Sequence, residues 1–159
     1  MTLATHVVSY RTIDLGVDAE RAVAHHRDAC ICSFGSDARF QGRKRYLKWL
    51  ESKIEEFPEG FLMAFIGERC VGQLELEVPY GLSAGYANLF YVTEQFRGMG
   101  FGRTLHDRAV TYFKSWEANQ IDLHCSPTNA KALSFYRSLG YRKTEQSADG
   151  ALWAMSKTI

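Results

Sequence analysis

The stretch that most constrains the fold is QFRGMGFGRTL at residues 95–105, which carries glycines at the alternate positions 98, 100 and 102. A strongly apolar run over residues 86–92 precedes it, and apolar residues at near four-residue spacing follow it over residues 101–116. These patterns predict a strand, a tight turn and a helix. Such a turn directs free backbone N–H groups and the positive end of a helix dipole at one point, where an anion such as phosphate can bind.

Two common phosphate-binding motifs do not fit this stretch. The Walker sequence GxxxxGK[ST] is absent, so no lysine stands where it would reach terminal phosphates. The glycines are spaced GxGxG, whereas a dinucleotide fingerprint requires GxGxxG. Asp122 also lies early in its expected strand rather than at its end. A nucleotide-binding α/β domain is therefore disfavoured.

The rest of the chain shows alternating strand and helix patterns. The order βααβββαβαββ indicates a mixed α/β sheet in a single domain over residues 1–159. Ser126-Pro127-Thr128 is expected to start the last helix, and Gly140 is expected to end it. Strands are expected at residues 6–13, 61–66, 71–78, 86–92, 121–125, 141–143 and 151–155, and helices at 17–31, 46–57, 101–116 and 126–139.

Composition argues against several classes of partner. The 19 Lys and Arg nearly balance the 18 Asp and Glu, so the net charge of +1 gives no general attraction for nucleic acid. The four cysteines form no zinc-type spacing, and we expect reduced thiols and no metal site. No stretch approaches the roughly 20 apolar residues of a membrane span, so a cytoplasmic protein that does not bind membranes is expected.

Two ordered blocks of sequence suggest a family. The first is R-x-x-G-x-G at Arg97, Gly100 and Gly102, and the second is LHCSPTNAKALSFYRSLGYRK at residues 123–143, with an asparagine, A-x-x-x-Y and a Leu-Gly-aromatic ending. Together they resemble the GNAT superfamily of N-acetyltransferases. The resemblance covers residues 86–143 well, and the first half fits only in its element order. It implies a three-layer GNAT-like fold, with a mostly antiparallel twisted sheet flanked by about four helices.

The resemblance also implies acetyl-CoA as cosubstrate and a set of residues that bind it. The strand before the glycines would bond the pantetheine arm through its backbone, and the loop amides would hold the pyrophosphate. Met99 and Phe101 would matter mainly for backbone placement, and Asn129 has the alternative role of a helix cap. The cofactor-binding residues expected are Phe90, Tyr91, Val92, Arg97, Gly98, Met99, Gly100, Phe101, Gly102, Arg103, Thr104, Asn129 and Tyr136.

Acetyl transfer to an amine requires a proton donor for the departing thiolate and a base for the amine. Tyr136 matches the family tyrosine that protonates the thiolate, and its alternative role is that of a core aromatic. Glu75 and Glu77, which share the polar face of one expected strand, and His124 are the candidates for the base. Glu75 is favoured narrowly because a simple hairpin register places it near Leu89, beside the expected thioester. Each also has a structural alternative, as part of a solvated strand face or as a structural histidine.

The functional prediction is transfer of an acetyl group from acetyl-CoA to a primary amine of a small molecule. Acetylation of a protein N-terminus or lysine is an alternative within the same chemistry. A non-catalytic acyl-CoA-binding module is an alternative from another class, although it would need neither Tyr136 nor a base. By resemblance alone, a homodimer is also expected.

Overall fold

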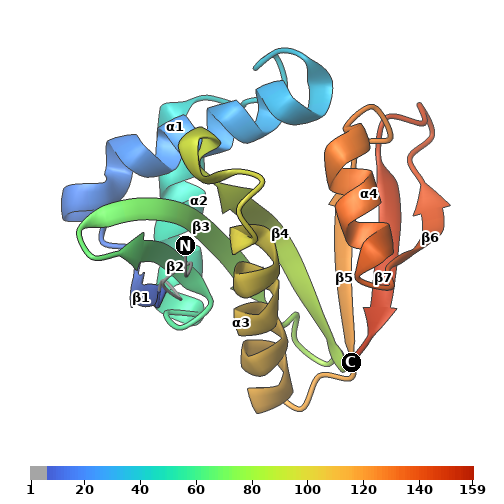
Figure 1. Cartoon of the computed structure of the whole chain (residues 1–159). Helices are drawn as coiled ribbons and strands as arrows, with labels where there is room; N and C mark the ends of the chain where they lie inside the picture. The colour runs from blue at the N-terminus through green and yellow to red at the C-terminus, as the bar shows by residue number, and fades with distance from the viewer. Residues whose placement is uncertain (1–6) are drawn as a thin grey trace, which may run out of the picture.

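The computed structural model describes residues 7–159. One seven-stranded sheet has the strand order β1-β2-β3-β4-β5-β7-β6 (Figure 1). Every neighbouring pair is antiparallel except β4 and β5, which run parallel. The strands are β1 (Ser9–Thr12), β2 (Phe61–Ile66), β3 (Arg69–Glu77), β4 (Ala84–Val92), β5 (Gln120–Cys125), β6 (Arg142–Gln146) and β7 (Trp153–Thr158).

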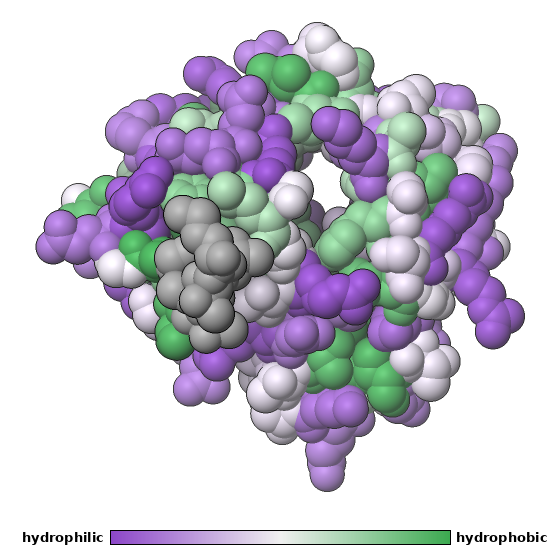
Figure 2. All heavy atoms as spheres, in the orientation of Figure 1, coloured by the Kyte–Doolittle hydropathy of each residue, from purple (hydrophilic) through white to green (hydrophobic). Residues whose placement is uncertain are grey.

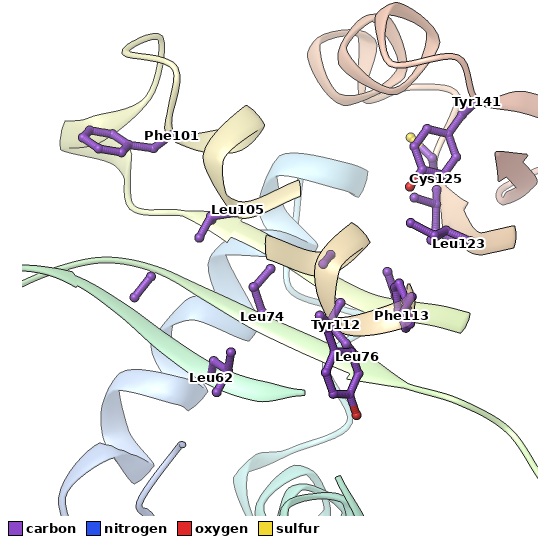
Figure 3. Packing of buried hydrophobic residues seen from close by; sticks show 14 of the residues in the cluster. Leu62, Leu74, Leu76, Phe101, Leu105, Tyr112, Phe113, Leu123, Cys125 and Tyr141 are labelled. Atoms are coloured by element: carbon purple, nitrogen blue, oxygen red, sulfur yellow. The ribbon is translucent and has the colours of Figure 1, made fainter. Parts of the chain in front are cut away.

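Helices cover both faces of the sheet, giving three layers (Figure 1). On one face, α1 and α2 pack over a core that includes Leu50, Phe61 and Met63. On the other face, α3 packs over Leu74 and Leu76, which Figure 3 shows from close by. The helices are α1 (Leu15–Phe34), α2 (Arg43–Glu56), the short 3₁₀ helix η1 (Glu94–Phe96), α3 (Phe101–Ser115) and α4 (Ala130–Ser138).

The predicted element order and fold class are confirmed, with shifts at some boundaries. His6, the first residue of the first expected strand, lies outside the described residues. The last helix does not start at Ser126-Pro127-Thr128 as predicted, because the Asn129 side chain accepts the N–H of Ala132 and caps a helix that begins at Ala130. The last two strands begin one and two residues later than predicted and extend further.

The polar face of β3 differs from the solvated face considered from the sequence. Gln73 and Glu75 alternate with apolar neighbours as expected, yet both are almost completely buried. Tyr46 of α2 covers them, and its hydroxyl donates to Glu75 Oε2 at 2.6 Å. The predicted register is confirmed, since Glu75 pairs with Leu89.

The parallel strands β4 and β5 are paired along only part of their length. Their ladder runs from Ala84 opposite Gln120 to Ala87 opposite Leu123. Beyond Ala87, β4 continues to Val92 while β5 diverges from it (Figure 1). The sheet is therefore split at its centre, and the glycine stretch begins just beyond the open end of β4.

None of the helices in residues 7–159 is long and apolar enough to cross a membrane.

Candidate active site

Backbone conformation and packing account for the three alternate glycines. Gly98 and Gly100 have φ angles of 75° and 90°, in the left-handed region that favours glycine. Gly102 has ordinary helical backbone, but a Cβ atom there would lie 3.3 Å from the Phe135 ring of α4. Two glycines thus shape the turn, and the third lets α3 approach α4 closely.

The turn leaves a cluster of backbone donors without partners. Gly100 caps α3, and the N–H of Thr104 is the first to bond back to it, at 3.3 Å. In the part of the chain that the structure describes, the six backbone N–H groups of residues 98–103 have no acceptor. Together with the helix dipole they fit a diphosphate, whose oxygens would satisfy these donors.

Arg97 braces this loop and has few donors left for an anion. Its guanidinium contacts Asp28 of α1 at 2.6 Å, and its Nε donates to the Val92 carbonyl at 2.9 Å. Tyr91 donates to the same Asp28 oxygen at 2.6 Å. Burial alone would raise the pKa of Asp28, but these hydrogen bonds outweigh it and lower that pKa below its ordinary value. Arg103 also lines the cleft and makes no such ion pair within residues 7–159, so its guanidinium can meet a phosphate.

The diverging strands enclose a cleft of about 840 Å³. Figure 2 shows the hollow that opens between the two halves of the molecule. The N–H of Thr93 donates to Val71 of β3, so by alternation Val92 and Phe90 direct their backbone groups away from β3 and toward the cleft. An extended chain that carries amides could pair with this open edge as a further strand would.

The C-terminal end of α1 forms part of the cleft wall through Ser33 and Phe34. Thr128, in the β5–α4 connection, donates its hydroxyl to the Ser33 carbonyl at 2.7 Å. Arg39, in the α1–α2 connection, contacts Asp149 in the β6–β7 connection at 3.5 Å. These two contacts connect the α1 side of the cleft to the side formed by α4 and the last strands.

Tyr136 projects from α4 into the cleft. Its ring contacts Phe90 of β4, with centroids 6.2 Å apart, and Tyr141, at 5.5 Å. Burial, with a smaller contribution from Cys125, raises the pKa of Tyr136 above its ordinary value. The phenol is thus protonated at neutral pH and can donate a proton.

Of the candidates for the base, His124 and Glu75 lie in different surroundings. His124 lines the cleft, and its Nδ1 is 2.6 Å from the Tyr86 hydroxyl. Glu75 does not line the cleft; it accepts hydrogen bonds from Tyr46 and Gln73 and is 1% exposed. Burial raises the pKa of Glu75 to about 7, although these hydrogen bonds oppose the shift.

Most of the predicted site residues meet in this cleft. Met99 is largely exposed, Phe101 packs in the core against Phe96, and the Thr104 hydroxyl bonds back to Gly100. These three side chains and Glu75 do not line the cleft. The predicted residues that do are Phe90, Tyr91, Val92, Arg97, Gly98, Gly100, Gly102, Arg103, His124, Asn129 and Tyr136.

Several residues of the cleft wall were not predicted from the sequence. His26 and Phe34 come from α1, Asn88 from β4 and Lys131 from α4. His26 stacks on Tyr46 with centroids 4.4 Å apart. The sequence around His26 mixes charged and aromatic residues, and no local motif distinguishes the side chains that face the cleft.

Comparison with known proteins identifies sequences that are similar to this chain. The model of the acetyltransferase (GNAT) family matches residues 21–141. An uncharacterized N-acetyltransferase of Archaeoglobus fulgidus is 27% identical over 113 residues, which cover 68% of this chain and 75% of that protein. N-alpha-acetyltransferase 30 of Homo sapiens is 26% identical over 91 residues, which cover 55% of this chain but only 25% of the human protein.

Solved structures share the fold at low sequence identity. Ard1 from Thermoplasma volcanium superimposes with a TM-score of 0.76 at 20% identity, covering 96% of this chain and 97% of that one. The PaiA N-acetyltransferase from Thermoplasma acidophilum, solved in complex with coenzyme A, has a TM-score of 0.70 at 18% identity, covering 96% and 99%.

The fold and the donor-rich cleft define an acyltransferase that uses a CoA thioester. The chain belongs to the acetyltransferase (GNAT) family, and acetyl-CoA is its cosubstrate.

Asp28→Ala tests the brace on the loop. Without the carboxylate, Arg97 loses its partner on α1, and we expect acetyl-CoA to bind about fivefold more weakly, or about 1 kcal/mol for a half-exposed charged pair. Isothermal titration with acetyl-CoA measures the change. Asp37→Ala, which removes an exposed Asp 3.8 Å from Arg27, is the matched control and should leave the affinity unchanged. Equal affinities for the two variants would show that the loop keeps its shape without Arg97–Asp28.

Glu75→Gln tests the consequence of the buried carboxyl group. Because the folded-state pKa is raised to about 7 from an ordinary value of 4.5, the native state holds a proton that the unfolded state has released. The free energy of unfolding should therefore fall by on the order of 3 kcal/mol as pH rises from about 4.5 to 7. Above that window it should remain at the lower value.

Glutamine remains neutral and can accept the hydrogen bonds of Tyr46 and Gln73 through its carbonyl oxygen. The variant should be more stable than the native protein at pH 8 and similar to it near pH 5, as measured by urea unfolding. Glu68→Gln, in the exposed β2–β3 turn, should follow the native pH profile. A native profile for Glu75→Gln as well would contradict the raised pKa.

Proposed function

We propose that the protein transfers the acetyl group of acetyl-CoA to a primary amine of a small molecule by direct attack on the thioester. The observation that carries this proposal is the position of the Tyr136 side chain. It lies in the same cleft as the unpartnered amides of residues 98–103 and the open edge of β4. One cleft thus holds backbone N–H groups that can bind phosphates, a strand edge that can pair with the amides of an extended ligand, and a proton donor.

Tyr136 would act as the general acid. When the amine attacks the carbonyl carbon, the bond from carbon to sulfur breaks and the sulfur leaves with the electron pair. The Tyr136 hydroxyl would transfer its proton to this sulfur. Because burial raises its pKa, Tyr136 carries that proton over the whole physiological pH range.

We assign the proton leaving the amine to His124 rather than to Glu75. His124 lies on the cleft wall, whereas Glu75 is enclosed by Tyr46 and Gln73. When His124 Nδ1–H donates to the Tyr86 oxygen, Nε2 keeps its lone pair and can accept a proton. Tyr86 would thereby hold the imidazole in the tautomer that a base requires.

Two features of the cleft favour a compact acceptor with one positive charge at most. The contacts Thr128–Ser33 and Arg39–Asp149 connect the two sides of the cleft beside α1, which suits a small molecule better than a lysine within a folded chain. Within residues 7–159, the charged residues that line the cleft are Arg97, Arg103 and Lys131, with no carboxylate among them. A polyamine would find no counter-charge there for its second ammonium group.

A protein N-terminus is a second candidate acceptor. N-alpha-acetyltransferases from several eukaryotes are among the relatives, and an N-terminal residue is also a compact amine at the end of a chain. The chain spans about a quarter of the length of the human relative, so the activity of that whole protein is not transferred to this one.

Tyr136→Phe tests the proposal in an assay of CoA thiol release from acetyl-CoA. The amine panel contains phenylethylamine, spermidine, a peptide with a free N-terminus and an N-terminally blocked lysine peptide. The native protein should acetylate phenylethylamine best, and Tyr136→Phe should reduce turnover by about 10²–10⁴-fold, the usual contribution of a general acid. The acetyl-CoA dissociation constant should not change.

Tyr112→Phe is the matched control because it removes another buried phenol, one that lies away from the cleft. It should leave turnover unchanged. Equal turnover for Tyr136→Phe and the native protein would remove Tyr136 from the acid role. A preference for the free N-terminal peptide would establish the second candidate, and transfer to none of these amines would overturn the proposed acceptor class.

A further inference from the structure

We propose that His106 of α3 and Tyr141 at the end of α4 form a buried hydrogen-bonded pair that holds Tyr136 in position for proton donation. Neither His106 nor Tyr141 is among the residues that line the cleft, so we treat both as positioning residues. This inference rests on the proposed function, because it concerns the residue proposed there as the acid. It adds that the position of Tyr136 depends on residues outside the glycine loop and the cleft wall.

The end of α4 connects Tyr136 directly to Tyr141. Gly140 has a φ angle of 97°, which lets the chain reverse in the left-handed conformation. The N–H of Tyr141 donates to the Tyr136 carbonyl at 3.0 Å, and the N–H of Gly140 donates to that of Arg137 at 3.0 Å. This is the Schellman arrangement, in which the first residue beyond the turn packs on the residue five positions before it. The two tyrosine rings accordingly contact each other, with centroids 5.5 Å apart.

The Tyr141 side chain is in turn held by His106 of α3, on the opposite side of the cleft. Its hydroxyl lies 2.8 Å from His106 Nε2. His106 is 2% exposed and Tyr141 is 3% exposed, so water does not compete for this bond. Burial, with nearby Lys157, lowers the pKa of His106 to about 4, and the imidazole is neutral under ordinary conditions. A neutral hydrogen bond of this kind keeps its strength throughout the pH range in which the enzyme would work.

A fourth ring completes the cluster and connects it to the cleft. Phe90 of β4 contacts His106, with centroids 5.7 Å apart, and it contacts Tyr136 at 6.2 Å. Phe90 of β4 and His106 of α3 lie on the side of the cleft that carries the glycine loop, whereas Tyr136 of α4 and Tyr141 just beyond it lie on the other side. The cluster therefore sets the distance between the proton donor and the loop across the gap where β4 and β5 are not paired.

The hydrogen bond fixes an orientation that packing alone does not specify. A second pocket of about 410 Å³ lies between α3 and α4, lined by His106 together with Val110, Leu139 and Lys157. His106 borders this pocket but is itself buried, so ring contacts hold the cluster together while the bond to Tyr141 sets how the two rings are turned. Losing that directional bond would let the Tyr141 ring, and with it Tyr136, change position.

A double-mutant cycle on turnover tests the proposal. Tyr141→Phe keeps the ring and removes only the hydroxyl, and we expect kcat to fall about tenfold, because small displacements of catalytic groups are costly. The acetyl-CoA dissociation constant should not change. In the Tyr136→Phe background there is no phenol left to position, so adding Tyr141→Phe should change kcat less than about twofold.

Thermal unfolding and a second variant separate positioning from general loss of structure. If Tyr141→Phe folds poorly, His106→Gln replaces it in the cycle, because this variant removes the imidazole. Its effect on kcat should likewise be large when Tyr136 is present and small in the Tyr136→Phe background. A tenfold loss in both the native and Tyr136→Phe backgrounds, or no loss in either, would overturn the positioning role. If Tyr136→Phe alone retains full turnover, the acid role of the proposed function fails instead, so the two failures are distinguishable.

Discussion

The structure depends on a single interruption, the loss of backbone pairing between β4 and β5 beyond Ala87 and Leu123. A sheet interior normally satisfies every N–H and C=O, and an open edge leaves these groups in need of partners. Here the open edge faces a cleft instead of bulk solvent. The unsatisfied backbone of β4 and the unpartnered amides after Gly98 then lie along one path, so an extended ligand with amides and phosphates completes what the fold leaves open.

The same interruption explains how charge is distributed around the site. Arg97 sits at the end of β4, where it bonds to Val92 and Asp28 and so ties the loop to α1. An arginine used in this way stabilises backbone geometry and contributes little net charge, because Asp28 balances it. Anion binding is then left to oriented amides and to Arg103, which makes the loop's shape, more than its charge, the basis for binding.

Local sequence patterns predicted the local parts of this arrangement. The glycine turn, the element order and the Glu75–Leu89 register depend on neighbouring residues and were all predicted. The partners of side chains were not predicted, because they come from distant segments: Asp28 contacts a loop 69 residues away, and Tyr46 covers a glutamate 29 residues away. The alternating pattern of a strand does not show whether its polar face will lie in water or under a helix. In this structure α2 covers the polar face of β3 and buries Glu75.

Burial has two opposing effects on an acid such as Tyr136. It keeps the phenol protonated, but it also makes the proton harder to release. A thiolate leaving in ordinary water would be too weak a base to take that proton easily. Cys125 indicates how the conflict is resolved, because this thiol lines the same cleft and burial raises its pKa to about 11. A departing thiolate in the same surroundings would be destabilised in the same direction, so burial would shift the pKa values of donor and acceptor together. In the proposed reaction a short distance between the Tyr136 hydroxyl and the sulfur would ease the transfer, so the position of the Tyr136 ring would matter as well as its acidity.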